Sequence, residues 1–225
     1  MPPLLEIEVL HPRDVAGAAE GGADRLFLTT PAGLSPDLRD ASAVLRESDL
    51  PVRVRLRLND GRSTTGGEFT RLVGLAEEYR ALGAEGVVFG FLDPDTRIDV
   101  ELCVALAEAL PAVPWTFSEA LDECLEPRRA WSAVAALPGC DGVLAAGSPR
   151  GMAAGYEDLL AEAQAHPESA RLMLPGRGLL AEHVPWLRRA GVAQFHVGAQ
   201  ARPGGSAKAY VDAGHVRSWR LLLDD

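Results

Sequence analysis

Short apolar runs alternate with amphipathic segments along the whole chain. Four β-rich runs each follow a glycine that can end a helix in the left-handed conformation, at Gly22, Gly83, Gly139 and Gly191. These glycines lie 61, 56 and 52 residues apart, close to twice the ~30-residue length of one strand–helix unit. A second series of strand-like runs fills the gaps, at 4–10, 51–58, 113–118 and 171–175.

Helical patterns separate all of these runs. No linker or low-complexity stretch divides the chain, and strand and helix alternate about eight times. Such alternation gives a parallel sheet, and eight units close into a barrel, whereas the competing doubly wound open sheet usually needs only five or six. The sequence therefore predicts an α/β protein with a single (β/α)8 TIM-barrel domain over 1–225. The predicted helices span 12–21, 36–47, 67–82, 98–110, 126–137, 151–164, 180–190 and 211–223.

Two of the predicted strands carry charge at every second position. Glu6 and Glu8 alternate with aliphatic residues in the first strand, and Arg53, Arg55 and Arg57 do so in the third. Side chains alternate between the barrel interior and the helix layer, and the aliphatic faces should pack on the helices. The charged residues are therefore predicted to point inward. Because alternate strands share layers of the interior, we expect the glutamates to lie level with some of the arginines.

The position of each inward residue along its strand separates structural from functional candidates. Active sites of such barrels lie at the carboxyl ends of the strands. For Glu6 and Arg53, lower in the barrel, the pattern favours structural ion pairs. Arg57, Ser118 and His196 lie nearer the strand ends, where they could bind an anion and move a proton.

Two glycine-rich loops follow the seventh and eighth strands. Gly176, Arg177 and Gly178 lie in the first loop, and Gly198 and Arg202 lie in the second. Barrel enzymes often bind phosphate with these two loops, because glycine lets backbone N–H groups approach the ligand. Glycine also simply closes tight turns, so each loop alone is weak evidence for a phosphate site.

Composition and charge narrow the class of protein. The chain has 225 residues, of which 47% are hydrophobic and 24% charged, as in soluble globular domains. Its net charge of −10 argues against a non-specific grip on nucleic acid or an anionic membrane. The apolar runs are far shorter than the roughly 18 residues of a membrane span, and the first residues do not resemble a secretory signal. We therefore predict a cytoplasmic protein without nucleic-acid or membrane partners.

A series of short phrases runs through most of the chain in one order: Leu5-Glu6-Ile7, Gly22-Ala23-Asp24-Arg25, Gly33-Leu34-Ser35-Pro36, Gly86-Val87-Val88-Phe89-Gly90, Pro175-Gly176-Arg177-Gly178 and Phe195-His196. The series resembles the copper homeostasis CutC family. This resemblance implies a TIM barrel, a cytoplasmic location and a role in copper handling, with copper as a ligand. The family's site residues carry over to Glu6, Arg57, Asp122, Gly176, Gly178 and His196.

The chain departs from the family pattern where a metal would be bound. Leu10 and Thr29 stand where the family usually places cysteines, and Ser118 stands where a histidine is expected. Cu(I) prefers thiolate and thioether ligands. Of the three cysteines only Cys124, after the fifth strand, could face the end of the barrel, with His196 as a second ligand. The sequence therefore predicts no high-affinity copper site of the cysteine type.

Two kinds of function remain open at this stage. The first is a copper-binding homeostasis protein with a polar pocket at the carboxyl end of the barrel. The second is a TIM-barrel isomerase or lyase acting on a small phosphorylated or carboxylated metabolite, and a divergent member without activity is a third alternative. In the enzyme, Arg57 and Arg177 would hold the anion, His196 or Glu8 would act as acid or base, and Asp122 would orient a cation or the imidazole. The expected partner is a small anionic ligand or a copper ion, and a homo-oligomer is compatible with the sequence.

Overall fold

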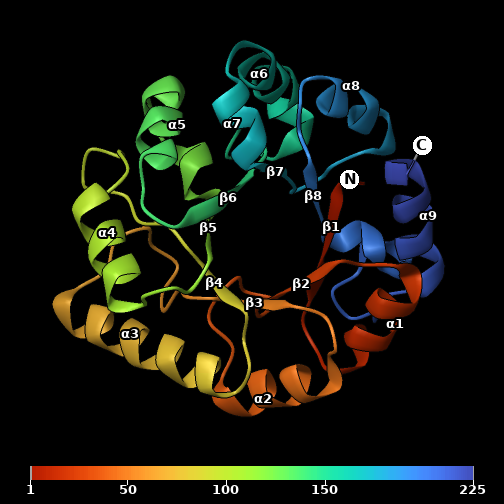
Figure 1. Ribbon diagram of the computed structural model, residues 1–225, viewed down its shortest axis with the longest axis horizontal. Helices are drawn as coiled ribbons and strands as arrows, with labels where there is room; N and C mark the ends of the chain where they lie inside the picture. Colours follow the sequence, from red (N-terminus) through yellow and green to blue (C-terminus); the bar gives the residue numbers. More distant parts are fainter. Residues whose placement is uncertain (1, 225) are drawn as a thin grey trace.

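The structure is a computed structural model that describes residues 2–224. Eight parallel strands form one sheet in the order β7-β6-β5-β4-β3-β2-β1-β8, and β7 also lies beside β8, so the barrel is nearly closed (Figure 1). The predicted (β/α)8 TIM barrel is confirmed. The strands are β1 (Leu4–Val9), β2 (Arg25–Leu28), β3 (Val52–Arg55), β4 (Gly86–Phe89), β5 (Trp115–Phe117), β6 (Cys140–Ala145), β7 (Met173–Pro175) and β8 (Gln194–Val197).

Helices surround the barrel on all sides (Figure 1). The α-helices are α1 (Arg13–Gly21), α2 (Leu38–Glu47), α3 (Gly66–Ala81), α4 (Val100–Ala109), α5 (Pro127–Ala135), α6 (Met152–Ala165), α7 (Pro167–Leu172), α8 (Val184–Arg189) and α9 (Ala213–Asp224). Short 3-10 turns follow several strands: η1 (Glu119–Glu123), η2 (Ala181–His183), η3 (Ala199–Ala201) and η4 (Pro203–Gly205).

The seventh strand is shorter than the sequence predicts. Residues 171 and 172, expected to be extended, end α7, which starts with Pro167 in its first turn, where proline is favoured. Gln194 bridges the join between β7 and β8. Its Nε2 donates to the carbonyl oxygens of Arg171 and Leu172 at 3.3 and 3.4 Å.

The alternation in β1 and β3 places their charges inside the barrel, as predicted. Val54 and Leu56 are buried in the apolar layer shared with the helices, and so are the aliphatic residues of β1. The side chains of opposite parity meet across the interior, where Arg53 of β3 reaches Asp141 of β6. Between the charged groups, four apolar side chains of the inward parity are buried: Phe27, Val88, Leu144 and Leu174.

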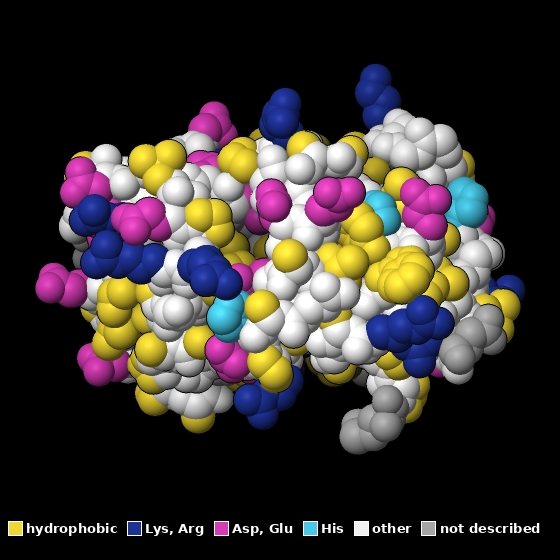
Figure 2. Space-filling view, turned by 90° about the horizontal axis from the view of Figure 1, so that it is seen from above, with side chains coloured by type: hydrophobic (Ala, Val, Ile, Leu, Met, Phe, Trp, Pro, Cys, Tyr) yellow, Lys and Arg dark blue, Asp and Glu magenta, His cyan; other side chains and the backbone are white. Residues whose placement is uncertain are grey.

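The outer surface over α5, α6, α7 and α8 has no single character. Figure 2 shows this face with acidic, basic and apolar side chains interspersed. Among residues 2–224, no helix combines the length and apolar character that crossing a bilayer requires.

Candidate functional site

Glu6 is the centre of a buried charge cluster in the lower part of the barrel, the part away from the carboxyl ends of the strands. It lies opposite both Arg25 and His196 in the strand ladders. Arg25 Nε donates to Glu6 Oε2 at 2.6 Å, and His196 Nδ1 lies 2.9 Å from Oε1. Burial alone would raise the pKa of Glu6, but Arg25 and His196 lower it to about 2. The carboxylate is therefore ionised and held by two partners, which is a structural arrangement.

The ion pairs of this cluster do not include the arginines of the third strand. Neither Glu6 nor Glu8 forms an ion pair with an arginine of β3 within the described residues. The partner of Glu6 is instead Arg25 of the neighbouring strand, which sequence reasoning missed. The strand β2 (Arg25–Leu28) contains only one charged residue, so no alternation marked Arg25 as an inward residue.

Arg53 closes the amino-terminal end of the barrel interior. Its two terminal nitrogens donate to both carboxylate oxygens of Asp141 at 2.6 Å, and its Nε donates to Glu85 at 3.2 Å. Thr116 accepts a further hydrogen bond. Asp141 raises the pKa of Arg53, although burial alone would lower it. These contacts support the structural interpretation of Arg53.

Three arginines converge on Glu119 at the mouth, the end of the barrel formed by the carboxyl ends of the strands. Arg55 Nη2 and Arg62 Nη1 donate to Glu119 at 2.8 and 3.0 Å, and Arg57 Nη1 lies 3.9 Å away. Burial would raise the pKa of Glu119, but Arg55 and Arg62 lower it well below its ordinary value. Arg62 and Glu119 were absent from the predicted site, because both lie beyond the regular strands.

Several of these guanidinium groups keep N–H donors without an acceptor. Within residues 2–224, Nε and Nη1 of Arg55 and Nε of Arg57 are buried and unpaired, and so is Nη2 of Arg25. Buried donors normally have partners. Burial, and then the nearby Arg62, lowers the pKa of Arg57. The mouth therefore carries N–H donors of Arg55 and Arg57 that the described residues do not satisfy, which suits a small anion.

Glu8 lies at the mouth without a partner. Its carboxylate points toward Gly198, and no ion pair or side-chain hydrogen bond of Glu8 is found within residues 2–224. Arg202, predicted to add charge to the phosphate loop, is instead buried in a two-point pair with Asp14, each at 2.9 Å. Its contact with Glu8 is to the backbone oxygen, at 3.1 Å, and not to the carboxylate. The Arg202 charge is therefore not free for a ligand.

Of the two predicted roles of Asp122, orienting the imidazole of His196 is not the one that the structure shows. Its carboxylate accepts hydrogen bonds from the backbone N–H groups of Ala146 and Gly147, at 2.9 to 3.1 Å. The cation that it holds is Arg177, whose Nη1 lies 3.1 Å away. Burial raises the pKa of Asp122 to about 6, against the effect of these donors. Asp122 thus ties together the loops after β5, β6 and β7.

Ser118 is inward and buried at the end of β5. Its Oγ accepts a hydrogen bond from the backbone N–H of Ala120 at 3.3 Å and so caps η1. A Cβ at Gly90 would lie only 2.6 Å from this oxygen, so the neighbouring strand needs glycine there. Ser118 therefore shapes the mouth through η1.

The three predicted glycines differ in what they allow. A Cβ at Gly176 would lie 2.9 Å from Cδ2 of His196, so glycine lets the imidazole pack under this loop. Gly178 has a φ of +103°, which favours glycine. A Cβ at Gly198 would lie 3.3 Å from the nearer carboxylate oxygen of Glu8. Two of the glycines thus make room for inward side chains, and whether they also seat phosphate stays a prediction.

Comparison with known proteins gives the family. The model of the CutC family matches residues 4–201. A CutC family protein of Xanthomonas campestris pv. campestris (strain 8004) is 30% identical over 216 residues, covering 94% of this chain and 88% of that protein. A CutC family protein of Xylella fastidiosa (strain Temecula1) is 31% identical over 202 residues, covering 88% and 75%. The chain belongs to the CutC family.

A solved CutC structure has the same fold. The CutC protein of Streptococcus agalactiae, whose name assigns it provisionally to copper homeostasis, superposes with a TM-score of 0.75 at 20% identity. The match covers 87% of this chain and 98% of that one. At this identity the likeness speaks for the barrel, while the family assignment comes from the sequence.

The three cysteines of this CutC chain lie in different parts of the fold. Cys103 lies in α4 and Cys140 begins β6, and burial raises the pKa of both thiols to about 12. Burial likewise raises the pKa of Cys124 to about 11. Within residues 2–224, no group of three histidine, cysteine or acidic side chains could hold a metal ion.

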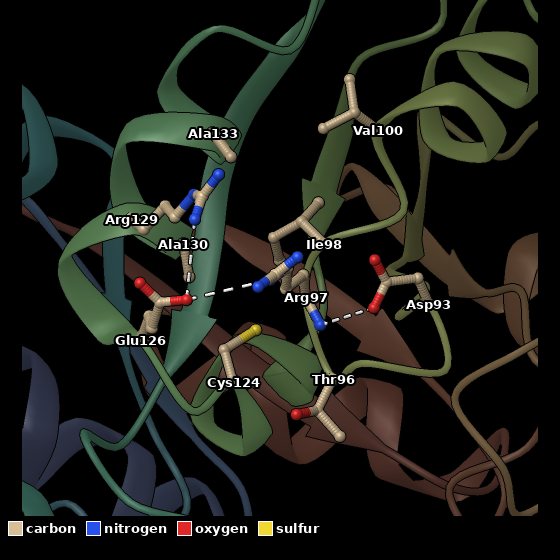
Figure 3. Close-up of a pocket in the computed structure, with 10 residues that line it drawn as sticks. All are labelled: Asp93, Thr96, Arg97, Ile98, Val100, Cys124, Glu126, Arg129, Ala130 and Ala133. Carbon is tan, nitrogen blue, oxygen red and sulfur yellow. Dashed lines mark hydrogen bonds and ion pairs between the residues drawn. The ribbon is translucent and has the colours of Figure 1, made fainter.

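Cys124 and His196 are not brought together. Cys124 lines a cavity of about 200 Å³ outside the barrel, between the loop before α4 and helix α5 (Figure 3). There Glu126 lies between Arg97 and Arg129, at 3.8 and 3.6 Å. His196 is bound to Glu6 inside the barrel. The residues predicted as copper ligands therefore belong to separate places, and the donor set does not fit one ion.

Proposed function

We propose that this CutC protein serves copper homeostasis by binding a small carboxylated or phosphorylated ligand at the mouth of its barrel. One observation carries the proposal. The side chain of Arg55 is only 5% exposed, yet its Nε and Nη1 have no acceptor within the described residues. The planar guanidinium fork matches the geometry of carboxylate and phosphate groups. A cytoplasmic location, as the family resemblance implies, is part of this proposal.

The free carboxylate of Glu8 favours a catalytic form of the same proposal. An isomerase or lyase needs a base near its anion site, and within residues 2–224 Glu8 has no partner that would hold its charge. His196 has a more limited role, because Nδ1 is engaged by Glu6. In this form Arg55 and Arg57 bind the anion, Glu8 accepts the proton, and His196 supports the floor of the site.

Binding of inorganic phosphate and propionate tests the anion site. At low salt, a probe at 100 times its Kd should raise the free energy of unfolding by ~2.7 kcal/mol. Arg55→Met should weaken binding at least about tenfold, because charged hydrogen bonds are lost. Arg97→Met, which removes a half-exposed surface arginine, is the matched control. If Arg55→Met is unstable, the partly exposed Arg57 gives a second variant. Equal affinity in wild type, Arg55→Met and Arg57→Met would contradict the proposal.

Copper itself is tested by a Cu(I) titration against a competing chelator. Because Cys124 and His196 lie in separate places and no group of three metal-binding side chains is found within residues 2–224, we expect no sub-micromolar site that depends on cysteine. Cys124→Ser should leave the titration unchanged. Sub-micromolar Cu(I) binding that vanishes in Cys124→Ser would show that copper, and not an organic anion, is the ligand.

A further inference from the structure

Phe27 neighbours both a free acceptor and a group of free donors at the mouth. Glu8 pairs in register with Phe27, whose side chain is buried in the interior. The guanidinium carbon of Arg55 lies 4.9 Å from the centre of the Phe27 ring. Yet Glu8 and Arg55 form no ion pair with each other within the described residues. Phe27 is thus a neighbour both of Glu8, in the strand ladder, and of the Arg55 guanidinium.

Two basic side chains next to β1 have partners other than Glu8. Both terminal nitrogens of Arg202 bind Asp14. On the other side, His196 is held by Glu6. The Glu8 side chain is half-buried, and its carboxylate oxygens are not among the buried unpaired atoms of residues 2–224, so they stay open to solvent. A donor on a bound ligand can therefore reach this carboxylate without displacing a protein partner.

We infer that the ligand of the mouth is a small hydroxy or amino acid anion, with its carboxylate or phosphate on Arg55 and its hydroxyl or amino group donating to Glu8. The inference rests on the proposed function, because it assumes that the anion binds at Arg55. A plain anion meets the same arginine but also the uncompensated negative charge of Glu8. An anion with a donor turns this repulsion into a hydrogen bond. Glu8 is thus the residue that selects between the two kinds of anion.

Matched probes that differ in one hydroxyl test this selection. Lactate is compared with propionate, and glycerol 3-phosphate with propyl phosphate, so that the two pairs also separate carboxylate from phosphate ligands. Wild type should prefer the hydroxylated member of at least one pair by about tenfold, the value of a charged hydrogen bond. In Glu8→Ala this preference should disappear, and the plain anion should bind more tightly than to wild type because the repulsion is gone.

Two variants control the result. Glu101→Ala removes the same charge from the exposed side of α4 and should keep the wild-type preference. If Glu8→Ala does not fold, the isosteric Glu8→Gln should reduce the preference, since a neutral amide is a weaker acceptor. An equal preference in wild type and the Glu8 variants overturns the selection by Glu8 while the anion site stands. Failure of all four probes to bind wild type overturns the proposed function as well.

Discussion

The lower layer of the barrel and its mouth carry the same kinds of side chain but satisfy them differently. Glu6 and Glu8 lie two residues apart on the same face of β1. Glu6 is held by Arg25 and His196, whereas Glu8 has no partner within the described residues. The inward direction of a charged side chain therefore does not show whether the residue stabilises the fold or is available to a ligand. The distinction lies in whether neighbouring strands bring a complementary group within reach.

Substituting each glutamate by alanine tests whether Glu6 contributes more to stability than Glu8. Glu6→Ala should lower the free energy of unfolding by roughly 3–5 kcal/mol, because it leaves the buried Arg25 without its charge partner. Glu8→Ala should change it by about 1 kcal/mol or less, since no protein contact is lost. Urea denaturation of both variants measures the difference.

A double-mutant cycle checks the cause of the first effect. If the pair Glu6–Arg25 carries it, Arg25→Met added to Glu6→Ala should restore part of the lost stability. A similar loss of stability in Glu8→Ala and Glu6→Ala would show that Glu8 also has a structural partner. The two layers would then not differ in how their charges are paired.

The rim of the mouth should respond to pH in the opposite direction from the lower layer. Burial raises the pKa of Asp122 to about 6, from an ordinary value of 3.8. Between these values the folded chain binds more protons than the unfolded chain, so this group makes stability fall as pH rises from 4 to 6. The stability of wild type relative to Asp122→Asn should therefore decrease by about 2 kcal/mol over this interval.

Glu6 supplies the opposite case in the same titration. Its pKa is lowered to about 2, so its stabilisation is complete above pH 4.5 and is lost as pH falls toward 2. Denaturation curves of wild type, Asp122→Asn and Glu6→Gln at each pH separate the two groups. A wild-type curve parallel to that of Asp122→Asn between pH 4 and 6 would mean that the Asp122 carboxyl titrates normally.

The smallest expected difference is between the stability costs of alanine at two glycines, one next to His196 and one next to Glu8. In Gly176→Ala the new Cβ would lie 2.7 Å from Cδ1 of Leu144 and 2.9 Å from the His196 ring, and this overpacking should cost about 1–3 kcal/mol. In Gly198→Ala the new Cβ would lie 3.3 Å from Glu8, a side chain that can move, so the cost should be below about 1 kcal/mol. Thermal unfolding measures both, and equal costs would indicate that Glu8 is as fixed as His196.

The sequence was sufficient for the architecture and for the direction of the charged side chains. Eight alternating units predicted the barrel, and the period of two in β1 and β3 predicted that Glu6, Arg53 and Arg55 point inward. Both patterns depend only on residues close together in the chain, so they can be recognised locally. The family resemblance was confirmed for the same reason, since its phrases lie along the chain in order.

Only the tertiary structure decided which of these side chains are paired and which are free. Closure of the barrel brings β8 and β2 to either side of β1, which assigns Arg25 and His196 to Glu6. The same folding joins Arg202 to Asp14 across 188 residues and places Cys124 outside the barrel. Ion pairs depend on distances of a few ångströms between remote segments, and no local pattern encodes these distances. The donors of Arg55 and Arg57 and the carboxylate of Glu8 remain unpaired within the described residues, because this long-range pairing brings no partner to them.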